Sequence, residues 1–299
     1  MIIANPIYDV VFKYLLEDLD IAKDLLSTIL GDTITHLTIK PQEELVKTEE
    51  GDIRIFRLDF KAVILLETGK EKTVLIELQK AKQSLDIFRF RKYLGKNYQE
   101  EEFKPDAKGR NIGHSLEIVT VYFLGFTLSN VPIPILKVQR NFINTITKES
   151  LKIDEDFINL LTHESYTIQI PRLKLKQQNE MEQILEVFSQ EYVSEDKHHI
   201  DYQGNLEHPI VKKIVRRLTK AAADENLLHQ MEAEDAVDRL LIRQRMEYEE
   251  KIQEKEAIIG EKEAIIGEKE AIIAQERAEK EQILAELAKL KAFLAEKKD

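Results

Sequence analysis

The chain has 299 residues, enough for one substantial domain with an appendage or for two modest domains. Its formal net charge of -11 at pH 7 argues against a protein that coats nucleic acid, although a local basic groove would still let it act on DNA. The absence of cysteine excludes disulfides, thiolate zinc sites and a cysteine nucleophile, and it is typical of a reducing cytosol. The N-terminal residues lack the features of a signal peptide, and no apolar run approaches the roughly 20 residues of a membrane helix. We therefore expect a cytoplasmic protein without a membrane partner.

The first thirty residues are expected to form helices. Apolar residues recur at helical spacing over residues 7–15 and again over residues 21–30. Asp18 or Asp20 is a candidate cap for the second helix, and Gly31 is expected to end it.

From residue 35 the pattern changes to the alternation that is typical of β-strands. Strands are predicted over residues 35–46, 53–66 and 70–79. Residues 67–69 form a three-residue hairpin loop between the last two strands, with Gly69 available for the left-handed conformation.

The middle of the chain mixes helix and strand signals. A helix is predicted over residues 85–102, and an almost wholly apolar strand, buried on both faces, over residues 116–126. Residues 166–170 are a further strand candidate, ended by a proline. From residue 177 the chain is predicted to be helical, with one break around residues 198–205 and the following proline.

The predicted hairpin places two carboxylates opposite each other. With the loop centred on Thr68, Asp59 lies opposite Glu77 and Arg57 lies opposite Gln79. Directly opposed residues share a face with Cβ atoms about 5 Å apart. Two carboxylates so close repel each other unless a cation lies between them, and oxygen-only ligands favour Mg²⁺ or Mn²⁺. The alternative, which the spacing alone favours, is the ordinary solvent-exposed face of an antiparallel sheet.

Several motifs within about residues 1–130 resemble those of a known nuclease family. They are NPIYDVVFKYLL, the aspartate of RLDF, IELQK, the helix with FRFRKY, and IVTVYFLGF. The order helix, strand, Asp-bearing strand, turn, Glu-x-Gln strand, helix, strand is similar to the PD-(D/E)XK nuclease core. The motifs are more narrowly similar to the Rpn family of recombination-promoting nucleases, also described as PD-(D/E)XK family transposases.

The resemblance implies a fold and an activity. The fold is an α/β, restriction-endonuclease-like core with a mixed sheet flanked by helices. The activity is that of a Mg-dependent endodeoxyribonuclease, a hydrolase of phosphodiester bonds in DNA recombination or transposition, in a bacterial cytoplasm. DNA is the implied partner and Mg²⁺ (or Mn²⁺) the implied cofactor.

The resemblance also implies roles for single residues. Asp59 and Glu77 would bind the metal ion, which activates water and offsets charge on the phosphate. Gln79 stands where the commonest version of the fold has lysine; it carries no charge but can orient the water. Lys61, on the same face, or Lys80, next to Gln79, would restore a positive charge, and Lys61 is the better geometric candidate.

Further candidates come from other acidic and basic residues of the chain. The resemblance implies that Asp9 brings an additional acid to the metal, and the alternative is an i,i+4 salt bridge with Lys13. His198 and His199 are adjacent and lack the spacing of a metal site. Candidate DNA contacts, each with a solvated helix or sheet face as its alternative, are Arg57, Arg89, Lys92, Lys96, Lys212, Lys213, Arg216 and Arg217.

The last segment contains a seven-residue repeat, EKEAIIG, twice and then EKEAIIA. Isoleucine recurs at heptad position a, whereas lysine occupies three consecutive d positions, which costs coiled-coil stability. A coiled coil that forms a homo-oligomer and a lone solvated helix are both open. The predicted division is therefore a nuclease-like core at 1–130, a mostly helical extension completing the domain at 131–245, and a heptad-repeat helix at 246–299.

Three classes of function follow. The first is the metal-dependent DNA endonuclease. The second is a catalytically inactive nuclease-fold module that binds DNA or a protein partner, which Gln79 and the acidic net charge keep open. The third is a structural protein organised by its C-terminal helix.

Overall fold

The computed structural model describes the chain except for residues 49–50, 66–68, 70, 82–90, 92–93, 96–97, 100, 106–109, 154, 175–178 and 297–299. For some further residues inside helices and strands, the structure describes the backbone but not the side chain. Asp59, Glu77 and Gln79 are among them. The chain divides into two compact units, Met1–Asp235 and Ala236–Asp299.

The N-terminal helices form as their apolar spacing predicts. α1 covers Asp9–Leu16 and α2 covers Leu19–Leu30. The side chain of Asp18 accepts a hydrogen bond from the backbone N–H of Ile21 and caps α2, and Gly31 ends the helix with a left-handed φ of 77°. Before them, β1 (Ile2–Ala4) pairs with β12 (His199–Asp201), a contact between distant segments that the sequence pattern does not reveal.

The predicted hairpin is confirmed. β2 (Thr33–Thr48), β3 (Gly51–Leu65) and β4 (Glu71–Ala81) are antiparallel neighbours. Gly69, between β3 and β4, adopts the left-handed φ of 76° that the turn requires. The β3–β4 ladder pairs Leu65 with Glu71 and Asp59 with Glu77, which is the predicted register.

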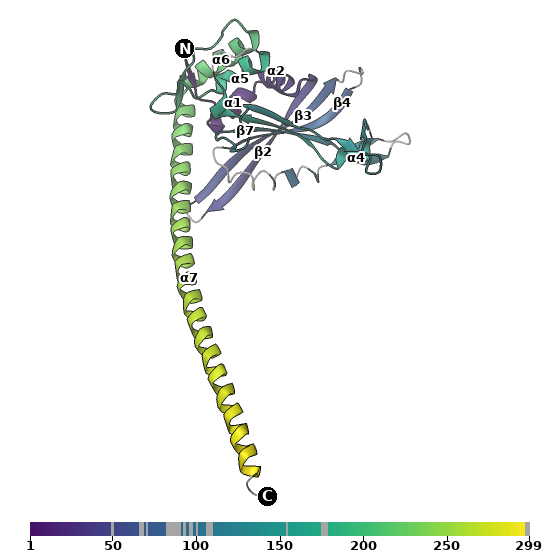
Figure 1. The fold of residues 1–299 in the computed structure, drawn as a ribbon. Coiled ribbons are helices and arrows are strands. Elements are labelled where there is room, and N and C mark those ends of the chain that lie inside the picture. The colour runs from purple at the N-terminus through teal and green to yellow at the C-terminus, as the bar shows by residue number, and fades with distance from the viewer. Residues whose placement is uncertain are drawn as a thin grey trace. The chain divides into compact units, whose positions relative to one another are not determined.

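The sheet continues with parallel strands. β7 (Glu117–Leu124) runs parallel to β4 and to β11 (Glu164–Gln169), and β8 (Ile135–Val138) pairs antiparallel with β11 at the edge. The order among the described strands is β2-β3-β4-β7-β11-β8, of which Figure 1 labels the first four. β7 lies inside this mixed sheet. Buried side chains occur on both of its faces, for example Thr120 on one and Val121 on the other, as predicted for a strand buried on both faces.

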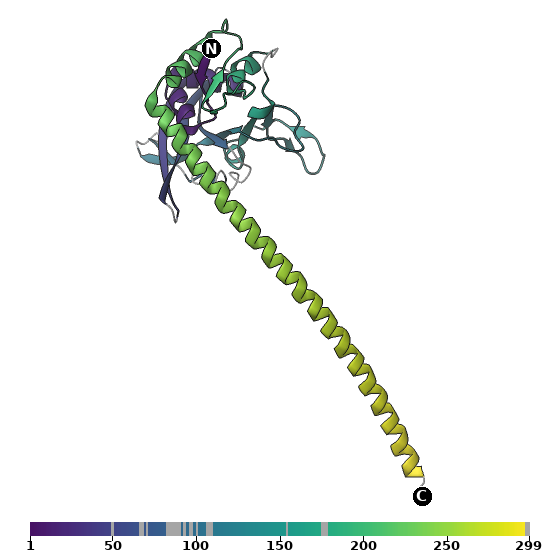
Figure 2. The same ribbon diagram turned by 90° about the vertical axis from the view of Figure 1, so that its left-hand side faces the viewer.

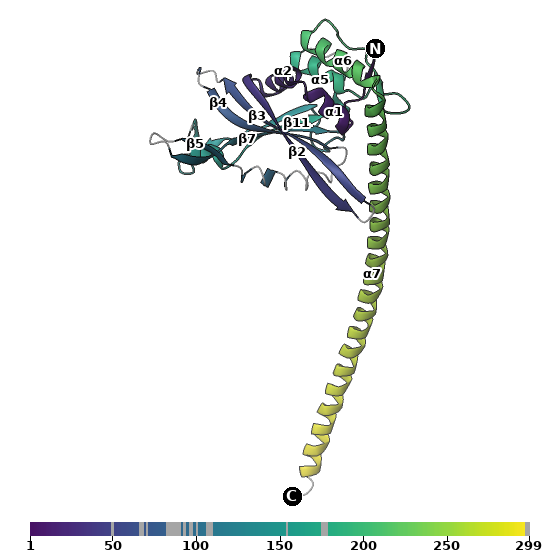
Figure 3. The ribbon, with the colours of Figure 1, turned by 180° about the vertical axis from the view of Figure 1, so that it is seen from behind.

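Helices cover one face of the sheet. α1, α2, α5 (Glu180–Leu185) and α6 (Pro209–Ala222) lie on the same side of it (Figures 1 and 3). Between these layers, the rings of Phe12, Phe123 and Phe188 meet with centroids 5.0–6.0 Å apart. The main hydrophobic core therefore lies between the helices and the sheet.

The helix predicted over residues 85–102 differs from the structure at its C-terminal end. Arg91, Leu94 and Gly95 are helical, but Glu101–Pro105 is strand β5, paired with β6 (Asn111–Ser115), so the predicted helix end at residue 102 is wrong. Residues 85–90 of that prediction lie outside the described residues.

Residues 131–245 are mixed rather than mostly helical. Besides β8, β11 and β12 they contain β9 (Phe142–Ile143), β10 (Ser150–Leu151), the short helix α4 (Asp156–Leu160) and the 3-10 turns η1 (Ile170–Arg172) and η2 (Glu186–Phe188). Several of these elements are too short for a hydrophobic period to be detected in the sequence, and for that reason the sequence does not predict them. The expected break near residues 198–205 is correspondingly wider, from Ser189 to His208.

The final helix, α7 (Glu225–Glu296), is continuous (Figure 2). Its first turns belong to the first compact unit, and from Ala236 onward it makes up the second. In the second unit, described isoleucine and leucine side chains such as Ile259 and Leu287 are exposed. No described helix combines the length and the apolar character that crossing a membrane requires.

Candidate active site

A row of polar positions crosses the sheet at the level of the predicted carboxylate pair. The backbone register pairs Asp59 with Glu77, and Glu77 with Thr120 on β7. Thr120 pairs in turn with Ser165 on β11, and Asp59 pairs with Lys40 on β2. Paired positions of neighbouring strands lie on the same face of a sheet. These five positions, which we call the polar row, therefore share one face.

The polar row lies on the face opposite to the helices. The residues that alternate with it along the strands, Phe60, Ile76 and Val121, belong to the main core together with residues of α1, α2 and α6. Since successive positions of a strand belong to opposite faces, the polar row belongs to the other face. The candidate chemistry is thus separated from the main core.

Thr120 and Ser165 form the described end of the polar row. Thr120 is fully buried, and its Oγ1 lies 2.8 Å from Ser165 Oγ and 3.4 Å from the carbonyl oxygen of Glu164. Neither residue is among the candidates of the sequence analysis. The available signal is that Thr120 is the single short hydroxyl residue in the apolar strand EIVTVYFL.

Lys61 and Gln79 flank the polar row on the same face. Lys61, which is half-buried, pairs with Leu75, one row from Asp59 and Glu77. Gln79 pairs with Tyr122 of β7, one row away in the other direction. The described β3–β4 pairs begin at Leu58, so the predicted pairing of Arg57 with Gln79 stays a prediction.

The metal-binding role of the carboxylate pair also stays a prediction. Among the described side chains, no three His, Asp or Glu residues gather closely enough to hold a metal ion. The side chains of Asp59 and Glu77 are not among the described ones, so this result does not test whether the pair binds metal. At this pair of positions the available donors are carboxylate oxygens alone, and a donor set of that kind fits Mg²⁺ or Mn²⁺.

Asp9 lies at the first turn of α1, beside an acidic residue of α7. The backbone N–H groups of Asp9 and Val10 donate to the Glu234 carboxylate at 2.9 and 2.8 Å. Glu234 thereby caps the positive end of the α1 dipole. The side-chain nitrogen of Lys13 lies 4.0 Å from a carboxylate oxygen of Glu17. The alternative salt bridge between Asp9 and Lys13 stays a prediction.

The basic residues of α6 divide into two groups. Lys213 forms an ion pair with Asp24 of α2 at 2.8 Å. The Arg217 guanidinium stacks 4.3 Å from the centroid of the Tyr14 ring and donates to the Tyr14 carbonyl oxygen at 2.8 Å. These two cations hold α6 against α1 and α2.

The second group forms one exposed line along α6. Lys212 and Arg216 lie on the surface one helical turn apart, and Lys220 continues their line one turn further. Of the other candidate DNA contacts, Arg89, Lys92 and Lys96 lie outside the described residues, and the side chain of Arg57 lies outside the described set.

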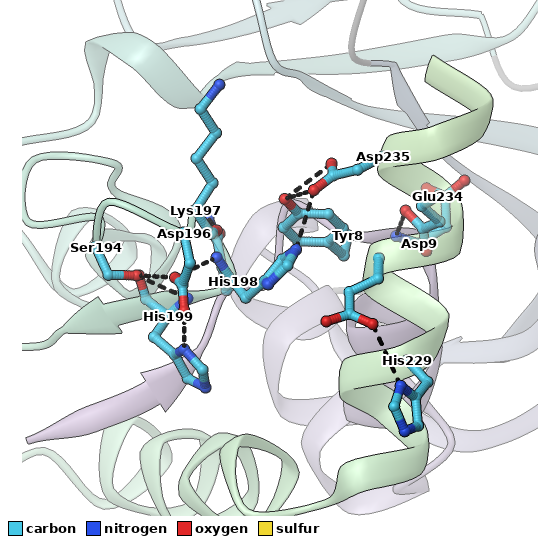
Figure 4. A network of polar contacts seen from close by, with 12 residues as sticks. Tyr8, Asp9, Ser194, Asp196, Lys197, His198, His199, His229, Glu234 and Asp235 are labelled. Atoms are coloured by element: carbon cyan, nitrogen blue, oxygen red, sulfur yellow. Dashed lines mark hydrogen bonds and ion pairs between the residues drawn. The ribbon is translucent and has the colours of Figure 1, made fainter. Parts of the chain in front are cut away.

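A second polar network joins the first turns of α7 to the N-terminal residues (Figure 4). The Tyr8 hydroxyl lies 3.0 and 3.1 Å from the two carboxylate oxygens of Asp235, to which it donates. His198 Nε2 lies 3.0 Å from the same carboxylate, and the Tyr8 and His198 rings meet edge to face. Since His198 is only 9% exposed, this network stabilises the fold of the first unit.

The loop before β12 is organised around Asp196 (Figure 4). Burial raises the pKa of Asp196, but hydrogen bonds from the Ser194 hydroxyl, the His198 backbone N–H and His199 Nδ1 outweigh burial and hold the pKa at about 2. The carboxylate is therefore ionised at neutral pH and fixes the turn. The sequence pattern does not reveal this role, because the partners meet only in the folded loop.

Comparison of the chain with protein-family models, with curated proteins and with solved structures finds no match. The fold by itself defines an α/β protein with helices, a long C-terminal helix and a mixed sheet that has six strands among the described residues. A polar row crosses that sheet on the face turned away from its helices.

Proposed function

We propose that the chain is a metal-dependent DNA endonuclease of the PD-(D/E)XK type. The observation that carries the proposal is the register that pairs Asp59 with Glu77 in adjacent antiparallel strands. Two acidic positions at that separation suit a shared divalent cation, and an uncompensated pair would repel.

The order of the elements supports the proposal. α2 is followed by three antiparallel strands, β2, β3 and β4, then by β5 and β6, and then by β7, which runs parallel to β4. Apart from β5 and β6, this is the succession of strands that the resemblance to the nuclease core implies. The two acidic positions occur on the second and third of these strands, as the resemblance also implies.

In the proposed mechanism Asp59 and Glu77 hold the divalent ion. When bound, such an ion supplies an activated water and offsets the charge that develops on the phosphate. Gln79, one row further on the same face, orients the water through its amide. Lys61, one row to the other side, supplies the positive charge that favours the phosphate.

A catalytically inactive module that binds DNA or a protein partner is the second candidate. The specific observation in its favour is Gln79, since an amide cannot provide the charge of the lysine that commonly occupies this position. The net charge of -11 is in keeping with it as well.

The experiment that tests the proposal is cleavage of supercoiled plasmid with Mg²⁺, Mn²⁺ or EDTA. We compare the wild type with Asp59→Ala, with Glu77→Ala and with Glu71→Ala, a control carboxylate at the exposed end of the same strand. The proposal requires metal-dependent nicking that is lost in the first two variants and kept in the third. Cleavage that survives both site substitutions would contradict the assignment. No cleavage under any condition would favour the inactive module.

A further inference from the structure

The second compact unit exposes an apolar stripe with a regular polar centre. Pairs of adjacent isoleucines recur every seven residues along α7, with 43–57% of each residue exposed: Ile258 and Ile259, Ile265 and Ile266, Ile272 and Ile273. Nothing within the described part of this unit covers them, because the unit is a single helix. Exposed apolar positions that repeat with a helical period mark an interaction surface.

Lysine occupies the centre of the stripe. Lys262 follows Ile258 and Ile259 by four and three residues, and it precedes Ile265 and Ile266 by three and four. Residues three and four apart are neighbours on a helix surface. Layers of isoleucine therefore alternate with single lysines along the stripe, and the partner must accommodate both.

A parallel, in-register pair of copies does not satisfy this pattern. Each d-position lysine, such as Lys262, would face its own copy. Further along the same seam Glu276 would face Glu276, and Lys280 would face Lys280. Like charges at several consecutive core layers destabilise a coiled coil.

An antiparallel pair satisfies the pattern in the register that also pairs the two charged residues Glu276 and Lys280 with each other. When Glu276 lies opposite Lys280 of the second copy, Ile273 lies opposite Ile283, and Lys269 lies opposite Leu287. Position 266 then pairs with position 290, and position 262 pairs with position 294. No layer of this seam brings like charges together. At its centre, Glu276 of each copy pairs with Lys280 of the other copy, which gives two ion pairs.

We infer that the second unit pairs with a second copy of this chain as an antiparallel coiled coil centred near residue 278. The paired span of residues 262–294 covers more than four heptads, beyond the three to four that sustain a coiled coil. The polar interruption between Ile273 and Ile283 is then the element that selects orientation and register. The inference is independent of nuclease activity.

The absence of cysteine makes the register directly measurable. We prepare Ile273→Cys and Ile283→Cys separately, oxidise each alone, and oxidise the mixture. The antiparallel register requires disulfide-linked dimers in the mixture and none with either variant alone. A parallel in-register pair would link each variant to itself and would overturn the inference. Ala278→Cys, at an outward heptad position, measures random collision.

Charge reversal provides an independent test on the same full-length chain. Glu276→Lys and Lys280→Glu should each weaken dimerisation about tenfold in sedimentation equilibrium, because each creates like-charge layers. The double variant Glu276→Lys with Lys280→Glu should restore the wild-type dissociation constant. A parallel pair already has like charges at these layers, so the single variants would leave it unchanged. A monomeric wild type at all concentrations would also overturn the inference.

Discussion

Asp59 of β3 and Glu77 of β4 stand directly opposite each other in an antiparallel ladder. Like charges in such a pair cost about 0.2–1 kcal/mol relative to small neutral residues. A divalent cation held between them reverses the sign of that interaction. If the proposed metal site exists, the pair lowers the stability of the fold without the ion and raises it with the ion bound, and stability measurements can separate the two states.

The first prediction concerns metal removal. In EDTA, Asp59→Asn should raise the melting temperature by about 1–3 °C, because it removes the repulsion with Glu77. In millimolar Mn²⁺ the order should reverse, since the wild type gains binding free energy that the variant lacks. Glu207→Gln, which removes an exposed carboxylate outside the sheet, is the matched control. Equal responses of wild type and Asp59→Asn to Mn²⁺ would exclude a metal site at this pair.

The hairpin register is predictable from the sequence because the loop fixes it. Gly69 is available for the left-handed position, and a short loop leaves one pairing for Asp59 once its centre is set. The rest of the polar row is not predictable in this way. Thr120 pairs with Glu77, and Ser165 pairs with Thr120, in parallel ladders. Parallel strands cannot be joined by a short hairpin turn that would fix their register.

The contacts of the N-terminal residues show the same limit. Tyr8 meets Asp235 across more than two hundred residues, and β1 pairs with β12 over a similar separation. Such contacts depend on how helices and sheet pack, which local periodicity does not encode. Short elements such as β9 and β10 carry too few residues for a readable period.

The second prediction concerns the buried hydroxyl of the polar row. Thr120→Val keeps the shape of the side chain but removes the hydroxyl that contacts Ser165 and the Glu164 carbonyl oxygen. We expect the free energy of unfolding in urea to fall by about 1–2 kcal/mol, because the Ser165 hydroxyl and the Glu164 carbonyl oxygen lose a hydrogen-bond partner. Thr120→Ser should retain part of that stability. Thr38→Val, at an exposed strand position, should change it by less than about 0.5 kcal/mol.

The third prediction concerns Gly204. A Cβ atom at this position would lie far inside van der Waals contact with Glu186 Oε1 and with the Tyr202 hydroxyl oxygen. Glu186 is buried and accepts hydrogen bonds from that hydroxyl at 2.7 Å and from the Asn205 backbone N–H at 3.0 Å. Gly204→Ala must displace this group, so we expect a loss of about 2–4 kcal/mol in chemical unfolding.

A second glycine provides the control for Gly204→Ala. At Gly260 in α7 a Cβ atom would meet open space. Gly260→Ala should therefore keep or raise the helical content measured by circular dichroism, because alanine favours helices by about 1 kcal/mol. If both substitutions were neutral, the close approach at Gly204 would not be the constraint that the geometry implies.

The fourth prediction concerns pH. The Asp196 pKa of about 2 lies below the ordinary aspartate value of 3.8. A carboxyl with a lower pKa in the folded state stabilises the fold above the unfolded pKa, and this contribution is lost as pH falls through the folded pKa. Asp196→Asn should therefore cost on the order of 1 kcal/mol at pH 5, after allowance for solvent screening, and progressively less between about pH 4 and pH 2. Carboxyl chemical shifts followed by NMR give the midpoint directly, and a midpoint near 3.8 would contradict the prediction.

The last prediction separates the two groups of cations on α6. Arg217→Gln should lower the free energy of unfolding by about 1–3 kcal/mol, because the guanidinium packs on the Tyr14 ring and donates to its carbonyl oxygen. The triple substitution of Lys212, Arg216 and Lys220 by glutamine should change stability by less than about 0.5 kcal/mol, since all three are exposed.

If the exposed line of α6 contacts phosphate, the triple substitution should weaken DNA binding more than Arg217→Gln does. In EDTA, where cleavage does not intervene, the triple variant should bind duplex DNA more weakly than the wild type. Its plot of log affinity against log salt should also be shallower, by about one unit for each phosphate that the variant no longer neutralises. Lys152→Gln, an exposed cation outside α6, should leave the slope unchanged. An unchanged slope in the triple variant as well would remove α6 from the DNA-binding surface.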